Sequence, residues 1–243
     1  MGLFAQFNQS FQMSLAQKRI RDFGWDRSLK NPLFLQMYPV LKHIKLYFDK
    51  LPDNGLKIYD FGCGTKPYRT LVKKNNYIGI DIDPKNTEAD IICDISKTPL
   101  QPNSGDLACS FFVLEHVINP YEVIKEKFRV LKKRGRLFMV APLFWEEHEQ
   151  PYDYFRYTQF SLRHMMETSG FSKINIKPIN GRHALLGLNL ARFCSYRRFL
   201  KYLVPLINLY FYKHHKKEIS AVNIGGNHEI HNVMSYSVEG IKE

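Results

Sequence analysis

Cysteine and long apolar runs are scarce in this chain of 243 residues. The four cysteines, at positions 63, 93, 109 and 194, have no Cys-x-x-Cys spacing, which argues against a disulfide framework or a zinc site. We expect them to be small core residues in a reducing compartment. Residues 1–17 are broken by Gln and Asn and lack the apolar region of a secretory signal. These absences predict a cytoplasmic protein.

Acidic residues are also few. The chain has 23 Asp and Glu against 35 Lys and Arg, which gives a formal net charge of +12. With 44% hydrophobic residues, this length favours one sizeable α/β domain with room for an elaboration but not for a second full domain.

A glycine-rich turn is the most informative feature that is present. The segment Lys57–Pro67 runs from an apolar strand into this turn, and a second strand, Tyr77–Asp81, follows it. Gly62 and Gly64 can adopt positive φ, so backbone N–H groups in the turn can approach a ligand closely. Asp81 ends the second strand, where an acid can accept both ribose hydroxyls of an adenosine.

Two residues distinguish this turn from the turn of a dinucleotide-binding site. Pro67 stands where a dinucleotide-binding turn has a third small residue at the helix N-terminus. Asp60 would repel a pyrophosphate, whereas it could bind an ammonium group. A ligand with an adenosine and a positively charged amino-acid end fits better than NAD, and S-adenosylmethionine is such a ligand.

From about residue 33 to residue 171 the chain resembles the class I S-adenosylmethionine-dependent methyltransferases. Five segments carry the resemblance in family order: Asp60–Gly64, Asp81, Asp94–Ile95, Asp106–Val117 with its Leu-Glu-His-Val, and Leu131–Pro142. Lys66-Pro67 and Lys133-Arg134 depart from the family pattern without removing a cofactor contact. The resemblance implies that the cofactor contacts are Asp60, Gly62, Cys63, Gly64, Asp81, Ile82, Asp94, Ile95, Ser110 and Phe111.

The fold that the resemblance implies is a Rossmann-like, doubly wound α/β fold. Its seven-stranded sheet has an antiparallel last strand, and a helical insertion lies between strands six and seven. We expect an N-terminal helical arm or lid at 1–50, a cofactor-binding core at 51–178, a basic apolar insertion at 179–231 and the final strand at 232–243. Met234, Tyr236 and Val238 alternate with Ser235, Ser237 and Glu239, which indicates the final strand that would complete the sheet.

The segment Phe144–Thr158 follows the fifth predicted strand, on the side where ligands of open α/β sheets bind. Its spaced His, Pro, Asp, Arg, Tyr and Thr resemble a block in a subset of these methyltransferases, several of them associated with glycan or cell-surface biosynthesis. We expect His148 and His116 to be candidate catalytic bases. The expected substrate-facing residues are Asp153, Arg156 as an anion clamp, and Tyr157.

Each of these assignments has a structural alternative. Asp153 and Arg156 could instead pair to hold the loop, and His116 could be a polar residue that caps a helix. No metal-binding cluster is evident: Asp81 and Asp83 share a strand end, but Asp81 is assigned to the ribose. We therefore expect no metal and no catechol-type metal-dependent transfer.

The predicted insertion holds eight Lys and Arg and no acid between Arg182 and Lys217. Its apolar and aromatic centre, Phe199–Tyr212, is too short to span a bilayer. Basic flanks around such a segment suit a helix that lies on an anionic membrane surface, here the inner membrane surface. The alternatives are a helix that caps the substrate site or one that forms a dimer interface. No nucleic-acid-binding module is recognised, so nucleic acid ranks lower as a partner.

The sequence thus predicts a methyltransferase that uses S-adenosylmethionine and acts at oxygen on a small-molecule, glycan or lipid-linked acceptor. Two alternatives remain open at this point. One is carbon methylation of an isoprenoid-quinone-type ring, and the other is a catalytically silent scaffold that binds the cofactor and docks a partner or membrane. The oligomeric state is not indicated.

Overall fold

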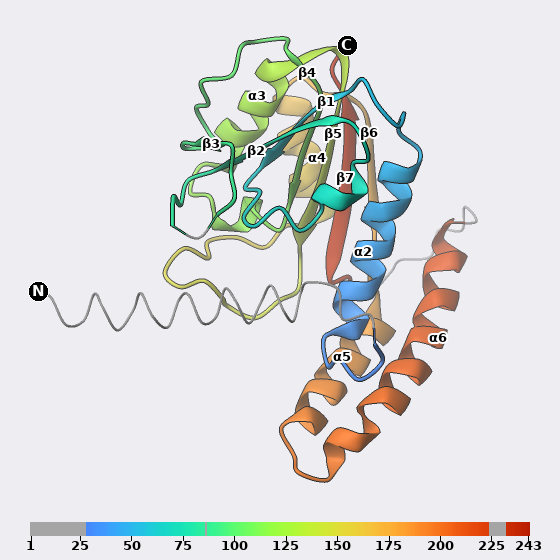
Figure 1. The fold of residues 1–243 in the computed structure, drawn as a ribbon. Helices are drawn as coiled ribbons and strands as arrows, with labels where there is room; N and C mark the ends of the chain where they lie inside the picture. The colour runs from blue at the N-terminus through green and yellow to red at the C-terminus, as the bar shows by residue number, and fades with distance from the viewer. Residues whose placement is uncertain (1–27, 86, 224–231) are drawn as a thin grey trace, which may run out of the picture.

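The computed structural model describes residues 28–85, 87–223 and 232–243, with side chains placed up to residue 219 in the second range. Most of the predicted N-terminal arm and residues 224–231 of the predicted insertion lie outside the described residues. The described part forms a sheet with helices on both faces and a long helical hairpin beside it (Figure 1).

The sheet has seven strands in the order β3-β2-β1-β4-β5-β7-β6. The strands are β1 (Lys57–Phe61), β2 (Asn76–Asp81), β3 (Ile91–Ile92), β4 (Gly105–Phe111), β5 (Leu131–Pro142), β6 (Ser172–Pro178) and β7 (Ser235–Ile241). The first five pair in parallel, and β7 runs antiparallel to both of its neighbours. The predicted sheet with an antiparallel last strand is confirmed.

The final strand is buried on both faces. Tyr236 and Val238 are buried, and so are Ser235 and Ser237, which alternate with them. The reason is the position of β7 between two strands of a sheet that is covered on both faces. The Ser235 hydroxyl is satisfied there by Asn180 Oδ1, at 2.8 Å.

Three helices cover the sheet. Helix α2 (Phe34–Asp49) lies on one face, where Ile44 and Phe48 pack among side chains of β1, β4 and β5. Helices α3 (Pro120–Val130) and α4 (Gln159–Thr168) contribute to the core on the other face. The Thr158 side chain accepts a hydrogen bond from the Ser161 N–H and so caps α4.

The insertion between β6 and β7 is helical, as expected. It consists of α5 (Arg182–Ser195), a 3-10 turn (Leu200–Leu203) and α6 (Val204–Asn223). The base of this α5–α6 hairpin packs on α2, where Leu35 meets Ala184 and Leu188, and Asn208 Nδ2 donates to the carbonyls of Leu29 and Asn31. The rest of the hairpin projects away from the sheet (Figure 1).

The carboxyl ends of β1, β2, β4 and β5 lie at one edge of the sheet because these strands are parallel. The segments that leave them are the glycine turn, residues 82–90, the 3-10 turn Leu114–His116, and residues 143–158. Ligands of open α/β sheets bind outside this edge. The fold therefore brings the predicted cofactor residues and both candidate bases to the same side of the molecule.

Candidate active site

The glycine turn has the geometry that its sequence predicts. Gly62 has φ +77° and Gly64 has φ +50°, both in the left-handed region that favours glycine. A Cβ added to Gly62 would lie 2.5 Å from Val113 Cγ1, whereas one added to Gly64 would meet nothing within 4 Å. Gly62 thus allows close packing inside the protein, and Gly64 borders the open space into which a ligand can approach the backbone.

Asp81 ties the end of β2 to this turn. Its Oδ2 accepts from the Gly64 N–H at 2.8 Å, and its Oδ1 accepts from the Ile82 N–H at 2.8 Å. A carboxylate that is held in this way is oriented by the backbone and stays next to the open face of Gly64. It is well placed to accept further hydrogen bonds from a diol.

Asp60 lies beneath the turn and not at its surface. It is 2% exposed, Tyr77 donates its hydroxyl to Oδ2, and Oδ1 is buried without a hydrogen-bond partner. Burial raises the pKa of Asp60 to about 6, so most of the carboxyl is ionised at neutral pH. It would therefore act on a bound ammonium group by its charge and through the turn.

Lys127 was not predicted and is the unusual neighbour of Asp60. Its side chain is fully buried, its Nζ lies 2.5 Å from Ser110 Oγ, and burial lowers its pKa to about 7. Lys127 Nζ lies 5.5 Å from the centroid of the Phe61 ring. Lys127 lies about one helical turn from both Val123 and Val130 and therefore on the apolar face of α3. This spacing could have indicated its burial from the sequence.

The remaining predicted cofactor residues divide by burial. Ile82 is 66% exposed and borders the same edge, and Asp94 is exposed with its Oδ1 bonded to the backbone and hydroxyl of Ser96. Cys63, Ile95, Ser110 and Phe111 are buried. Phe111 stacks edge-on with core rings of Tyr68 and Phe138, so its side chain belongs to the protein interior.

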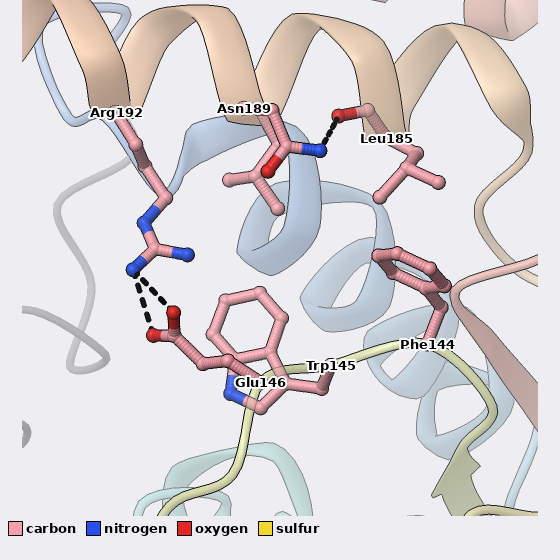
Figure 2. Close-up of a pocket in the computed structure, with 7 residues that line it drawn as sticks. Phe144, Trp145, Glu146, Leu185, Asn189 and Arg192 are labelled. Carbon is pink, nitrogen blue, oxygen red and sulfur yellow. Dashed lines mark hydrogen bonds and ion pairs between the residues drawn. The ribbon is translucent and has the colours of Figure 1, made fainter.

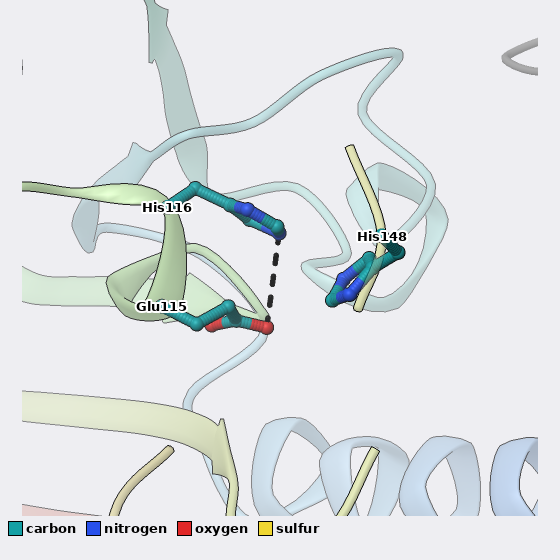
Figure 3. Close-up of side chains that lie close together, drawn as sticks. All are labelled: Glu115, His116 and His148. Carbon is teal, nitrogen blue, oxygen red and sulfur yellow. Dashed lines mark ion pairs between the residues drawn. The ribbon is translucent and has the colours of Figure 1, made fainter. Parts of the chain in front are cut away.

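Both candidate bases lie together, with a carboxylate that sequence reasoning missed. His116 and His148 have ring centroids 4.7 Å apart, and Glu115 completes a cluster in which one ligand-type atom from each residue lies within 4.8 Å of the others (Figure 3). Glu115 is 0% exposed, and burial raises its pKa to about 8. The position of Glu115 next to His116 in the Leu-Glu-His-Val segment could have pointed to it from the sequence. Its closeness to His148 is seen only in the folded structure.

Each histidine is oriented through Nδ1. His116 Nδ1 lies 2.8 Å from the Tyr152 carbonyl, and His148 Nδ1 lies 3.2 Å from both the Glu146 carbonyl and Asp153 Oδ2. A carbonyl oxygen can only accept, so Nδ1 carries the proton in each ring and Nε2 of the neutral ring keeps its lone pair. Burial, helped by the nearby His116, lowers the pKa of His148, which favours the neutral ring.

The predicted substrate-facing residues have partners within the protein. Arg156 holds Asp153 by two hydrogen bonds, of 2.6 and 2.8 Å, and this pairing keeps the pKa of Asp153 far below its usual range. Tyr157 is 4% exposed and donates its hydroxyl to the Leu114 carbonyl. Asp153 and Arg156 thus form the loop-holding pair that was the structural alternative, and Asp153 fixes the His148 backbone and ring in turn.

A cavity of about 210 Å³ lies beside this loop, between residues 144–146 and α5 (Figure 2). Its walls combine apolar and polar side chains, and an ion pair between Arg192 and Glu146, at 2.7 and 2.9 Å, lies at one side. The lining residues are Phe144, Trp145, Glu146, Leu185, Leu188, Asn189 and Arg192. Glu146 also accepts from His148 and Arg156 through its carbonyl, so the cavity adjoins the histidine cluster.

Comparison with known families decides the class of this site. Residues 59–139, which contain the glycine turn, Asp81, Asp94 and the Leu-Glu-His-Val segment, match the family model described as a methyltransferase domain. These residues carry a methyltransferase domain. The predicted recognition of an S-adenosylmethionine-dependent methyltransferase, with S-adenosylmethionine as its cofactor, is confirmed. No curated protein matches the chain by sequence.

Solved structures share the fold of this methyltransferase domain at low sequence identity. An S-adenosylmethionine-dependent methyltransferase from Thermotoga maritima is 16% identical, with a TM-score of 0.57, and the match covers 99% of this chain and 98% of that one. Phosphoethanolamine N-methyltransferase 2 of Haemonchus contortus, in complex with S-adenosyl-L-methionine, is 15% identical with a TM-score of 0.55. That match covers 82% of this chain and 52% of the other, so the chain spans about half the length of that enzyme.

A third structure shows that the same fold serves other chemistry. The [4+2]-cyclase SpnF is 16% identical with a TM-score of 0.56, over 85% of this chain and 82% of the cyclase. At such identities the likeness concerns the fold, and the reaction must be argued from the site itself.

Proposed function

We propose that this methyltransferase transfers the methyl group of S-adenosylmethionine to a hydroxyl oxygen of a small-molecule, glycan or lipid-linked acceptor. The observation that carries the proposal is the pair of histidines at the carboxyl edge of the sheet, each with Nδ1 held by an oxygen and Nε2 left to accept a proton. Transfer to an oxygen gains from a base near neutral pKa, which histidine supplies.

The residues of the turn fit the cofactor. Asp81 would accept the ribose hydroxyls, the open face of Gly64 would take the amino-acid part, and the buried charge of Asp60 would favour its ammonium. When bound, S-adenosylmethionine supplies a methyl group on a sulfonium, which is already a good leaving group. The main tasks of the protein are then to align the acceptor and to remove one proton.

The proton would pass from the acceptor hydroxyl to Nε2 of His148 or His116 as the new oxygen–carbon bond forms. The imidazolium produced would be stabilised by carboxylates that already lie nearby. His148 has Asp153, and His116 has Glu149 Oε2 at 3.6 Å. The Asp153–Arg156 pair would keep the His148 ring in place. The loop between these two residues is held in turn by the backbone N–H groups of Tyr154 and Phe155, which donate to the Glu115 carbonyl.

The cavity beside the loop is a candidate acceptor site. Its apolar wall, formed by Trp145, Leu185 and other side chains, suits a hydrophobic part of the acceptor, and the Arg192–Glu146 pair offers polar contacts at its side. This arrangement suits a lipid-linked acceptor or a glycan with an apolar portion.

The test is transfer from isotopically labelled cofactor to panels of hydroxyl-bearing acceptors, including sugars, sugar phosphates and lipid-linked sugars. We expect label in a product whose methyl group mass spectrometry and NMR locate on oxygen. A methyl group on a ring carbon of a quinone precursor would instead establish the carbon-methylation alternative. Binding of the cofactor without label transfer to any acceptor would favour the silent scaffold.

We further propose that the α5–α6 hairpin docks on an anionic membrane surface. Large apolar side chains are exposed along it, with Phe199 77%, Tyr202 72% and Leu206 65% exposed. Ile207 packs within the hairpin, whereas the exposure of Leu203, Leu206 and Tyr210 favours a surface outside this chain over packing on the sheet of the same chain. No described helix is long and apolar enough to cross a membrane.

Cationic side chains lie next to the exposed aromatic rings of the hairpin. Arg197 lies 5.2 Å from the Phe193 ring, Arg198 5.7 Å from the Phe199 ring, and Lys201 5.2 Å from the Tyr202 ring. Aromatic rings with adjacent cations suit the boundary between lipid headgroups and acyl chains. A cavity for a lipid-linked acceptor lined by α5 would then lie close to the membrane.

Vesicle flotation tests this docking. We expect binding to anionic vesicles and little to neutral ones, with a loss in high salt because surface charges are screened over about 8 Å at physiological ionic strength. Changing Arg197, Arg198, Lys216 and Lys217 to Gln should abolish the binding. The matched control changes four exposed lysines away from the hairpin, Lys50, Lys85, Lys97 and Lys133, to Gln and should keep it. Equal and negligible flotation in all conditions would exclude the membrane, and a dimer by light scattering would then assign the hairpin to a second subunit.

A further inference from the structure

The Glu115–His116–His148 cluster contains a buried carboxyl group that lacks a hydrogen-bond partner in the described part of the chain. Glu115 is 0% exposed, and neither of its side-chain oxygens forms a hydrogen bond with any described residue. The nearest cation-forming atom is His116 Nε2, at 4.0 Å from Oε1, which is too far for a hydrogen bond. Burying an ionised carboxyl group is costly unless a positive charge lies beside it, so Glu115 could be ionised here only with such a charge as its neighbour.

The two imidazoles have the support that metal ligands usually have. Histidine ligands of metals almost always donate the other ring N–H to a carbonyl or carboxylate, which fixes the tautomer. His116 Nδ1 meets the Tyr152 carbonyl, and His148 Nδ1 meets the Glu146 carbonyl and the Asp153 carboxylate. Both rings therefore have their Nε2 lone pairs available, and Asp153 is itself held by Arg156. Nδ1 of both rings lies near an oxygen that can accept its proton. A single general base would need this arrangement for only one of the two histidines.

We propose that Glu115, His116 and His148 bind one divalent transition-metal ion of the Zn²⁺ type. Two imidazole nitrogens and one carboxylate oxygen are a ligand set of catalytic zinc sites, which keep a further position open. This set also suits other first-row ions, whereas Mg²⁺ and Ca²⁺ prefer oxygen ligands alone.

The separations allow such a site after small side-chain movements. The ligand atoms lie within 4.8 Å of one another, whereas bonds of about 2.0–2.2 Å in a tetrahedral site place them roughly 3.4 Å apart. Rotation of the Glu115 carboxyl would bring it closer to the two rings, because none of the described residues forms a hydrogen bond with either of its oxygens, and the two rings would also have to approach each other. Glu149 is a second carboxylate near the cluster, with its Oε2 3.6 Å from His116 Nε2.

The binding of the ion does not depend on the reaction, but its role rests on the proposed function. The ion would use the Nε2 lone pairs to which proton transfer is assigned above. The histidines would then be ligands, the acceptor oxygen would bind at the open position, and the ion would help that hydroxyl to lose its proton to solvent.

Binding is tested with Co²⁺ and Zn²⁺ on the tag-free full chain after treatment with a chelator and dialysis. We expect one Co²⁺ per chain with the visible absorption of cobalt bound through nitrogen, and displacement of Co²⁺ by Zn²⁺ in calorimetry. Asp153→Asn keeps all three ligands and should weaken binding by about 10- to 100-fold. Glu115→Gln and His148→Ala remove a ligand and should weaken it further, with circular dichroism confirming that each variant is folded.

A second group of histidines supplies the control. His183 and His214 stack at 5.6 Å near Glu218 on the hairpin, and His164 is exposed on α4. His214→Ala and His164→Ala should leave the cobalt spectrum and its stoichiometry unchanged. The proposal is overturned if Co²⁺ binding survives in the folded Glu115→Gln and His148→Ala variants, or if the wild type binds neither ion. Methyl transfer by a chain that binds no metal would leave the proposed function standing with the histidines as bases.

Discussion

Replacing Asp81 with alanine is expected to weaken binding of S-adenosylmethionine by about 10- to 100-fold for each ribose hydroxyl that loses its acceptor, because a hydrogen bond to a charged group contributes about 1.5–3 kcal/mol. Asp81 lies at the end of β2, and its carboxylate is already oriented by the N–H groups of Gly64 and Ile82. Isothermal calorimetry with the cofactor and with S-adenosylhomocysteine measures the loss.

Asp81 also supports the glycine turn, so the ribose contact must be separated from loss of loop order. The 2′-deoxy analogue of S-adenosylhomocysteine should bind the wild type more weakly than the parent compound does. In Asp81→Ala this difference should vanish, since the acceptor of that hydroxyl is gone. Asp83→Ala, two residues along the same segment, is the matched control and should keep full affinity. Unchanged affinity in Asp81→Ala would remove Asp81 from the cofactor site.

The sequence was sufficient for those parts of the site that depend on local chain geometry. The glycine turn and the acid of β2 are specified by residues a few positions apart, and the structure gives Gly62, Gly64 and Asp81 the arrangement that such a motif requires. The seven-stranded sheet with its antiparallel last strand followed from family resemblance. The burial of Ser235 and Ser237 could not be read from the alternating sequence, because it depends on β6 and β5 on either side of β7.

The parts that escaped prediction depend on contacts between distant segments. Glu115 is adjacent to a predicted base, but its meeting with His148 requires residues 143–158 to fold back over the 3-10 turn after β4. Lys127 escaped because hydrophobic patterning counts a lysine as exposed, whereas this one is buried against Ser110 and near Asp60. An apolar run such as Phe199–Tyr212 gives the same pattern whether it is covered or exposed, and only the fold decides.

Removing the histidine that acts as the base is expected to have the largest effect on the chemistry. One of the two variants, His148→Ala or His116→Ala, should lower turnover by about 10²- to 10⁴-fold, the usual contribution of a positioned general base. Affinity for S-adenosylmethionine should remain nearly unchanged, because neither ring contacts the glycine turn or Asp81 by any hydrogen bond that the described residues make. The measurement is a single-turnover rate with labelled cofactor and the acceptor found in the transfer assay, beside calorimetry of cofactor binding.

The pattern of loss across variants then separates the roles that the cluster can have. A single base predicts that one histidine variant loses transfer and the other keeps most of it, and that added imidazole restores part of the lost rate. A bound ion predicts similar losses for both histidines and for Glu115→Gln, together with loss of wild-type activity after chelation. His164→Ala, which changes an exposed ring on α4, should behave as the wild type in every arm. Full activity in both histidine variants would show that transfer proceeds by alignment of the two substrates alone, with the proton leaving to water.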